Sequence, residues 1–398
     1  MVIKVEDDES SIRHIEALAF NRTASSLGET KAIEYIEREL EDCNIYSRRD
    51  YFKWKSPIRY IIRLAYLLIL FYGVAFQQIL LLLVYLLLKN TFSRTRELSL
   101  IPKEKSKNLI TEYKGDENIK NKPLVIFTSH YDSLSSFLPY YIQNIIFLFY
   151  RTLIAIYSAL NIFLYGWFLL SALGIFYFNS SIFANIALFS SIFGIFASVP
   201  LLIIVFYEKP STGSIDNASG VSILIELAKL IKKNPLENIG VILIWTGAEE
   251  WGLKGSENYC ELHYKDLNLQ YDLSKSYNIN IDMVGTYIGL INRTGIFRKP
   301  INRNLNNQIM ESAKNLEIPM TKYFKLININ SDHRSFKSFV KKTDGGFQIS
   351  CFHSAKDSKF IHSSKDTPDK CSSEVLNNCI ELCYETLKNM DNSIHNEG

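Results

Sequence analysis

The stretch that decides the fold is IGVILIWTGAEE, residues 239–250. Its first seven residues are apolar or glycine without polar alternation, which is typical of a strand buried on both faces of a parallel sheet. Glu249 and Glu250 follow that strand closely. Because ligands of open α/β sheets collect at the carboxyl ends of the strands, this carboxylate pair indicates where a functional site is expected.

Strands and helices alternate along most of the remaining water-facing sequence. Strands are predicted at residues 108–113, 123–128 (PLVIFT) and 278–281 (NINI), after an extended piece at 45–54. Apolar residues at helical spacing predict helices at 24–43, 220–231, 306–315 and 373–389. This alternation predicts an α/β domain with a central mixed, mostly parallel sheet flanked by helices.

The overall composition excludes several classes of protein. The 398 residues are 47% apolar, and 44 Lys and Arg nearly balance 41 Asp and Glu. These values exclude a disordered tail, a collagen-like chain and a strongly basic nucleic-acid binder, so no nucleic-acid partner is expected. The six cysteines show no Cys-x-x-Cys spacing, and the acidic N-terminus has no apolar core that would predict a secretory signal peptide.

Two long uncharged runs interrupt the mixed sequence. Residues 64–88 carry no charge, and Arg151 is the only charged residue from 133 to 207. Runs of about 20 apolar residues are long enough to cross a bilayer as helices. We therefore expect membrane segments at 56–90 and 136–207, and a water-facing domain assembled from 1–55, 91–135 and 208–398.

Within residues 136–207 we expect an interfacial stretch at 137–150 and two spans at 152–178 and 182–206, joined by a far turn at 179–181. Residues 56–90 are interpreted as a short hairpin with both ends on one side of the bilayer, with a single span as the alternative. Either arrangement gives an integral, multi-pass protein of the cell membrane with the lipid bilayer as a partner.

Metal-binding residue types recur where the predicted strands end and in two loops. They are His130, Asp132, Asp216, Glu249, Glu250, Asp282 and His362. Any one of these residues is ordinarily a helix cap, a solvated loop residue or a structural histidine. Two adjacent carboxylates beside a buried strand, however, repel each other unless a cation lies between them or one is protonated. Two His, two Asp and one Glu form a ligand set suited to zinc.

The motifs HYDS, DNASG, GAEEWGLKGS, NIDMVG and HSSKDTPD occur in this order from residue 130 onward. Together with SDHRSF at 331–336 and the helix at 24–43, they resemble metallopeptidase family twenty-eight, the two-zinc aminopeptidases of the bacterial leucine-aminopeptidase type. The resemblance covers nearly all of the water-facing sequence, whereas the apolar runs have no counterpart in soluble members. It implies the zinc-exopeptidase fold and a peptide substrate.

The resemblance also implies a role for each motif residue. Asp216 would bridge two zinc ions, His130 and Asp282 would complete one ion's protein ligands, and Glu250 and His362 would complete the other's. Asp132 would orient the metal site, and Glu249 would be the general base toward a metal-bridged hydroxide. Arg334 within SDHRSF is either a solvated arginine, the favoured reading, or a partner for a substrate carboxylate, which would favour carboxypeptidase action.

A membrane-bound zinc aminopeptidase is therefore the favoured function. A related glutaminyl cyclase-like zinc acyltransferase and a non-catalytic membrane scaffold remain alternatives. Because His130 and Asp216 have to meet at one site, the apolar block between them should cross the bilayer an even number of times. Positive charge near the spans lies on the catalytic side, which predicts that the catalytic domain is cytoplasmic.

Overall fold

A computed structural model describes residues 9–55, 103–115, 122–134, 140–177, 179–206, 211–325 and 330–395. The chain forms two compact units. The sheet unit comprises Met1–Trp54, Lys105–Ser136 and Lys209–Gly398, and the hairpin unit comprises Lys55–Glu104 and Phe137–Glu208. The expected membrane hairpin at 56–90 lies outside the described residues.

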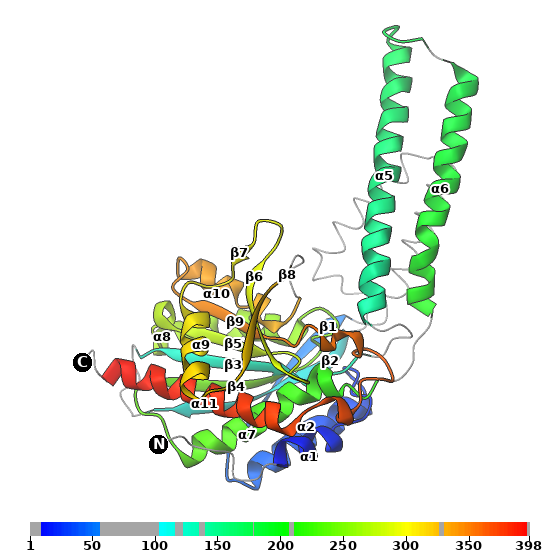
Figure 1. Cartoon of the computed structure of the whole chain (residues 1–398). Coiled ribbons are helices and arrows are strands. Elements are labelled where there is room, and N and C mark those ends of the chain that lie inside the picture. Colours follow the sequence, from blue (N-terminus) through cyan, green and yellow to red (C-terminus); the bar gives the residue numbers. More distant parts are fainter. Residues whose placement is uncertain are drawn as a thin grey trace. The chain divides into compact units, whose positions relative to one another are not determined.

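The sheet unit contains a nine-stranded mixed sheet in the order β1-β2-β4-β3-β5-β9-β6-β7, with β8 paired to β6 (Figure 1). Its strands are β1 (Arg48–Lys55), β2 (Lys103–Lys114), β3 (Leu124–His130), β4 (Gly240–Thr246), β5 (Tyr277–Ile281), β6 (Ile288–Thr294), β7 (Lys299–Pro300), β8 (Met320–Lys325) and β9 (Gln348–Phe352). The four neighbours β4, β3, β5 and β9 run parallel, whereas β2 and β6 pair antiparallel to β4 and β9. The predicted α/β class with a mixed central sheet is confirmed.

The central strands are buried as their sequence predicts. Every residue of β3 and β4 is buried, so helices must cover both faces of the sheet. The segment between β2 and β3 does not join neighbouring strands, because β4 lies between them. The strand that carries the carboxylate pair is thus in the interior of the sheet.

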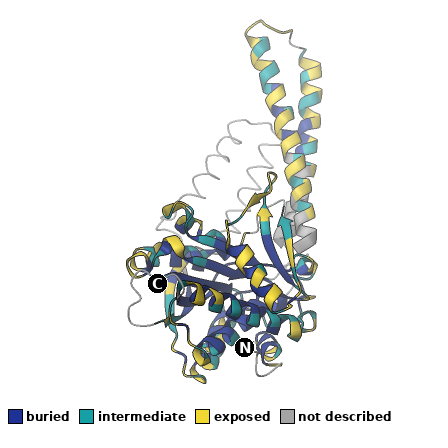
Figure 2. Ribbon diagram, turned by 60° about the vertical axis from the view of Figure 1, so that its left-hand side comes forward, coloured by how far each residue is buried: buried dark blue, intermediate teal, exposed yellow. Residues whose placement is uncertain are grey.

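Helices cover both faces of the sheet, and Figure 2 shows the buried strands between them. One hydrophobic core joins the sheet to α1 (Ser10–Ala17), α2 (Leu27–Glu41), α7 (Ser219–Lys233), α9 (Leu305–Asn315) and α11 (Ser373–His395). A second core joins the opposite face to α8 (Lys254–Gln270) and α10 (Lys337–Lys342). The helices predicted at 24–43, 220–231, 306–315 and 373–389 are confirmed with small shifts of their ends.

The hairpin unit contains two long apolar helices, α5 (Tyr140–Ala172) and α6 (Ser180–Phe206). In the part of the chain that the structure describes, Leu148–Ala172 is long and apolar enough to cross a membrane, and Ser180–Phe196 is apolar but shorter. This criterion concerns length and composition only. Within the unit, Asn161 of α5 donates a hydrogen bond to Ser190 Oγ of α6 at 3.1 Å, which joins the two helices.

The predicted bounds of these helices need correction. The expected interfacial stretch and first span form one helix, which ends at Ala172 instead of continuing to 178. Gly174 has a φ of 75°, a left-handed conformation that commonly follows a helix. Asn179 accepts a hydrogen bond from the Ile182 amide and so caps the next helix. The expected turn at 179–181 therefore lies mostly inside α6, and the connection begins earlier.

The start of α7 packs too closely on the sheet for any side chain at Gly220. A Cβ atom there would lie 2.6 Å from the Ile281 carbonyl oxygen and 2.5 Å from Ser129 Oγ. We predict that Gly220→Ala lowers the free energy of unfolding by about 1–3 kcal/mol, because the helix has to move off β3 and β5. Thermal denaturation measures the change. In the control Gly166→Ala, where no atom lies within 4 Å, the melting temperature should not fall.

Candidate metal centre

Three neighbouring parallel strands deliver acidic and imidazole side chains to one edge of the sheet. His130 is the last residue of β3, and its Cα partner Thr246 is the last residue of β4, just before the Glu249-Glu250 pair. Asp282 follows β5 on the other side of β3. Parallel strands end at the same edge, so residues far apart in the sequence lie close together here.

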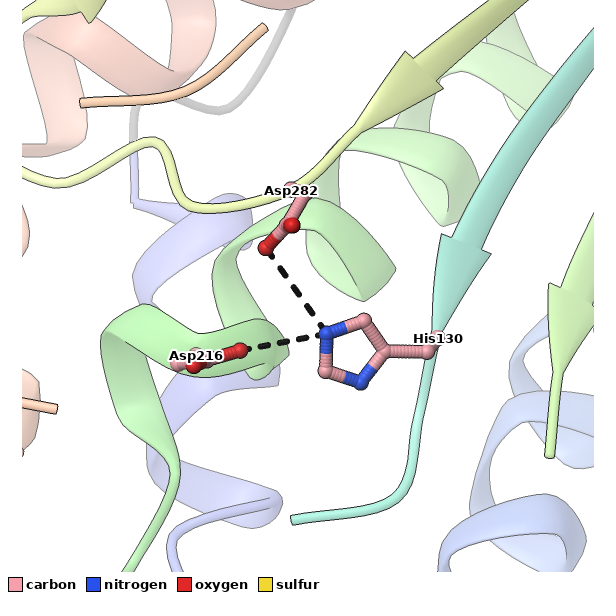
Figure 3. Close-up of side chains that lie close together, drawn as sticks. All are labelled: His130, Asp216 and Asp282. Atoms are coloured by element: carbon pink, nitrogen blue, oxygen red, sulfur yellow. Dashed lines mark ion pairs between the residues drawn. The ribbon is translucent and has the colours of Figure 1, made fainter. Parts of the chain in front are cut away.

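The first cluster contains His130, Asp216 and Asp282 (Figure 3). His130 Nε2 lies 3.1 Å from Asp216 Oδ1 and 3.7 Å from Asp282 Oδ1. Asp216 lies in the short helical turn η1, Ser214–Ala218, which leads into α7. All three side chains are buried.

The second cluster contains Asp216, Glu250 and His362. His362 Nε2 lies 3.1 Å from Asp216 Oδ2 and 3.0 Å from Glu250 Oε1. His362 has a φ of 55°, a left-handed backbone that is uncommon for residues other than glycine. The two carboxylate oxygens of Asp216 thus face different imidazoles, and this residue belongs to both clusters.

Asn217 anchors the turn that carries Asp216. Its side-chain amide donates to Ser129 Oγ at 3.0 Å and to the Ile281 carbonyl at 2.9 Å. Its carbonyl oxygen accepts from the amides of Gly220 and Met283. One buried side chain therefore joins the ends of β3 and β5 to the start of α7, and it fixes Asp216 between the two strands.

Asp132 connects His130 to the Glu249-Glu250 pair. Its two carboxylate oxygens accept hydrogen bonds from the backbone amides of Glu249 and Glu250, at 3.0 and 3.2 Å. Its Oδ1 also lies 3.7 Å from His130 Nδ1, and its backbone carbonyl oxygen lies 3.0 Å from the same nitrogen. Asp132 is fully buried, so these contacts are shielded from water.

The centre concentrates buried negative charge. Asp132, Asp216, Glu249 and Asp282 are each at most 7% exposed, and the Glu250 side chain is 8% exposed. Burial by itself would raise the pKa of Asp216, but hydrogen bonds from His130 and His362 outweigh burial and hold that pKa below its ordinary range. Burial would lower the pKa of His130 and His362, but the carboxylates around each imidazole raise both pKa values above the ordinary one.

The donor atoms fit zinc. Within each cluster the ligand atoms all lie within 4.8 Å of one another. Ligands about 2.1 Å from a tetrahedral zinc ion are themselves about 3.4 Å apart, close to the separations seen here. Imidazole nitrogen and carboxylate oxygen are both zinc ligands, and cations would neutralise the buried carboxylates.

Glu249 belongs to neither cluster. Burial, together with the carboxylates of Glu250, Asp332 and Asp282, raises the pKa of Glu249 well above its ordinary value. A carboxylate with a raised pKa beside the metal ligands is suited to accept a proton near neutral pH.

Two further residues support the centre without having been predicted. Arg22 is fully buried and donates to the carbonyl oxygens of Tyr131, Thr212 and Gly213, at 2.7–2.8 Å. It therefore ties the loop after His130 to the loop before Asp216. Asp366, which lies within HSSKDTPD, accepts from the Ile215 amide at 2.6 Å, and burial raises the pKa of Asp366 to about 7.

Arg334 is half-buried and makes a local contact. It ends the short turn η3, Asp332–Arg334, and donates to Asn330 Oδ1 at 2.5 Å. Asp332 in the same turn is fully buried and accepts a hydrogen bond from Thr246 Oγ1 at the end of β4. The segment SDHRSF therefore contacts the sheet edge through Asp332.

Residues 198–387 match the model of a family described as Peptidase family M28. The matched segment spans slightly less than half of the chain. It contains Asp216, Glu249, Glu250, Asp282 and His362, whereas His130 precedes it. Over 77 residues the chain is 42% identical to aminopeptidase YwaD of Bacillus subtilis (strain 168), which covers 19% of this chain and 16% of that relative.

Several solved structures resemble this chain over most of its length at low sequence identity. An aminopeptidase from Aneurinibacillus sp. strain AM-1 has a TM-score of 0.55 at 17% identity, covering 96% of this chain and 93% of that one. A Fimbriiglobus ruber glutaminyl cyclase has a TM-score of 0.57 at 15% identity, covering 98% and 96%. BSAP, a zinc aminopeptidase from Bacillus subtilis, has a TM-score of 0.54 at 14% identity, covering 96% and 94%. These likenesses show the fold, and the chain spans about a sixth of the length of the curated aminopeptidase that it matches.

Removing the Asp132 carboxylate should weaken metal binding although Asp132 belongs to neither cluster. We predict that Asp132→Ala lowers zinc affinity about 10–100-fold, because the Glu249-Glu250 backbone and His130 lose their common anchor. Competition against a chromophoric chelator measures the affinity. Asp369→Ala, at a mostly exposed carboxylate, is the control and should bind zinc like the unaltered chain. Equal affinities in the two variants would contradict the role given to Asp132.

Proposed function

We propose that this chain is a membrane-bound, zinc-dependent aminopeptidase that hydrolyses N-terminal residues from peptides. The observation that carries the proposal is the position of Asp216, whose two oxygens each lie 3.1 Å from a different imidazole. A carboxylate shared in this way supports a site for two metal ions per chain. His130 and Asp282 would hold one ion, and Glu250 and His362 would hold the other.

Two zinc ions bound there would polarise the scissile carbonyl group and make a water molecule more acidic. Glu249 would accept the proton of the attacking water and then deliver it to the leaving amine, since its pKa is raised and it lies beside the metal ligands. Asp132 would hold Glu249 in place through the Glu249 amide. Asp216 would fix the separation of the two ligand sets, because it belongs to both.

The roles of Glu249 and Asp216 can be separated by mutation. We predict that Glu249→Gln keeps about two zinc ions per chain but lowers kcat for aminoacyl amides by at least about a hundredfold. Asp216→Asn should lose both zinc and turnover. Metal analysis and steady-state kinetics on detergent-purified protein measure the two properties. If Glu249→Gln hydrolyses the amides at the unaltered rate, Glu249 is not the general base.

The same assay separates the peptidase from its structural relatives. Glutaminyl peptides would release ammonia and a cyclised product if the chain were a cyclase like the Fimbriiglobus ruber structure. The proposal expects a free N-terminal amino acid instead. A chain that binds no zinc and turns over neither substrate would be a scaffold.

Attachment to the membrane is proposed from the hairpin unit. Leu148–Ala172 would extend about 37 Å as a helix, which exceeds the hydrocarbon core of a bilayer. Ile162, Phe163, Phe168 and Leu169 each expose about half or more of their surface on this helix. Exposed side chains of this kind are suited to contact with lipid. With α5 and α6 as two spans, the chain returns to the side from which it left.

The charge distribution supports a cytoplasmic sheet unit, since the connection between α5 and α6 carries no charged residue. We predict that an impermeant maleimide labels Phe176→Cys, in that connection, in intact cells. Leu269→Cys, at an exposed position of the sheet unit, should be labelled only after permeabilisation. The unaltered chain controls for its native cysteines. The reverse pattern would place the sheet unit outside the cell.

A further inference from the structure

A pocket lies in the sheet unit beside the turn between β6 and β7. This hairpin pocket has a volume of about 400 Å³ and includes Thr294, Ile296, Phe297, Lys299, His333 and Lys337 in its lining. The chain turns at Gly295, whose φ of 79° suits glycine, so residues on both sides of the turn face one cavity. Figure 1 shows the β6–β7 hairpin projecting beyond its neighbouring strands.

The polar groups of the hairpin pocket are donors without matching acceptors. Lys299 and Lys337 are exposed lysines that form no ion pair with a carboxylate among the described residues, and neither Asp nor Glu lines the pocket. His333 is only 5% exposed, and its Nδ1 has no hydrogen-bond partner among the described residues. Buried polar atoms are normally paired, so the unpaired His333 nitrogen, in a pocket lined by two lysines and no carboxylate, points to an anionic ligand.

One residue of the hairpin pocket, His333, connects it to the sheet edge at which the metal centre lies. His333 follows Asp332, whose carboxylate accepts from Thr246 at the end of β4. The charge of Asp282, which belongs to the first cluster, acts on the His333 imidazole. Burial lowers the pKa of His333 to about 3, so the ring is neutral and one of its nitrogens carries a hydrogen to donate.

We propose that the hairpin pocket binds a carboxylate group of the substrate, either an acidic side chain or the free C-terminal carboxylate of a short peptide. This inference rests on the proposed peptidase function and names its substrate class. Lys299 and Lys337 pair with the carboxylate, and His333 donates a hydrogen bond to it. Ile296 and Phe297, which are 80% and 85% exposed, cover the aliphatic part of the same residue. These are specificity residues and take no part in bond cleavage.

Matched peptides test the inference and identify the source of the carboxylate. The pairs are Leu-Glu-amide against Leu-Gln-amide, Glu-Leu-amide against Gln-Leu-amide, and Leu-Leu free acid against Leu-Leu-amide. In at least one pair the unaltered chain should prefer the carboxylate by about tenfold or more in kcat/KM. The double variant Lys299→Met/Lys337→Met should bring that ratio close to one, because the carboxylate peptide loses its two cationic partners.

Lys341→Met is the matched control, because Lys341 is an exposed lysine of α10 that does not line the hairpin pocket. It should keep the full preference. A preference that survives the double variant, or equal rates within every pair for the unaltered chain, would overturn the inference.

A binding experiment separates failure of the inference from failure of the proposed function. If none of the peptides is hydrolysed, the peptidase proposal fails. Calorimetry with glutarate and glutaramide then shows whether the hairpin pocket binds a carboxylate. Glutarate should bind the unaltered chain and the Lys341→Met variant but not the double variant, while glutaramide should bind none of them. Equal heats from glutarate and glutaramide would overturn the carboxylate site.

Discussion

The carboxylate of Asp216 is the interaction on which the rest of the structure depends. Its two oxygens face imidazoles that come from the end of β3 and from a loop near the C-terminus. Sharing one carboxylate between two ligand sets places them at a separation determined by a single planar group. It also concentrates buried negative charge that cations would neutralise. The surrounding hydrogen bonds hold the two ligand sets in position.

The paired strands and the hydrogen bonds at their ends hold these ligand residues in place. The parallel strands β3, β4 and β5 end at one edge, so His130, the glutamate pair and Asp282 arrive together. Asp132 and Asn217 then link those strand ends to each other and to η1. Arg22 joins the loops on either side of the long apolar insertion. A chain interrupted between His130 and Asp216 can therefore still bring both residues to one site.

Part of the fold and of the metal centre could be predicted from the sequence, because the relevant information is local. The apolar run before Glu249, and the polar residues that follow β3 and β5, indicate strands and the edge at which their ligands meet. The structure brings together all five predicted ligand side chains. Arg22 could not be found in this way, because its acceptors are backbone carbonyl groups that no sequence pattern reveals. The end of α5 and the start of α6 depend on Gly174 and Asn179. The length of an apolar run does not reveal these local signals. The hairpin pocket arises only when η3 meets the β6–β7 turn in the folded chain.

The central claim is that Asp216 lies between two metal ions. Anomalous X-ray scattering at the zinc edge, from crystals of the zinc-loaded protein, tests it most directly. We expect two peaks about 3.5–4 Å apart. One peak should be in bonding contact with His130 and Asp282, the other with Glu250 and His362, and both with Asp216. A single peak, or a peak away from Asp216, would contradict the account.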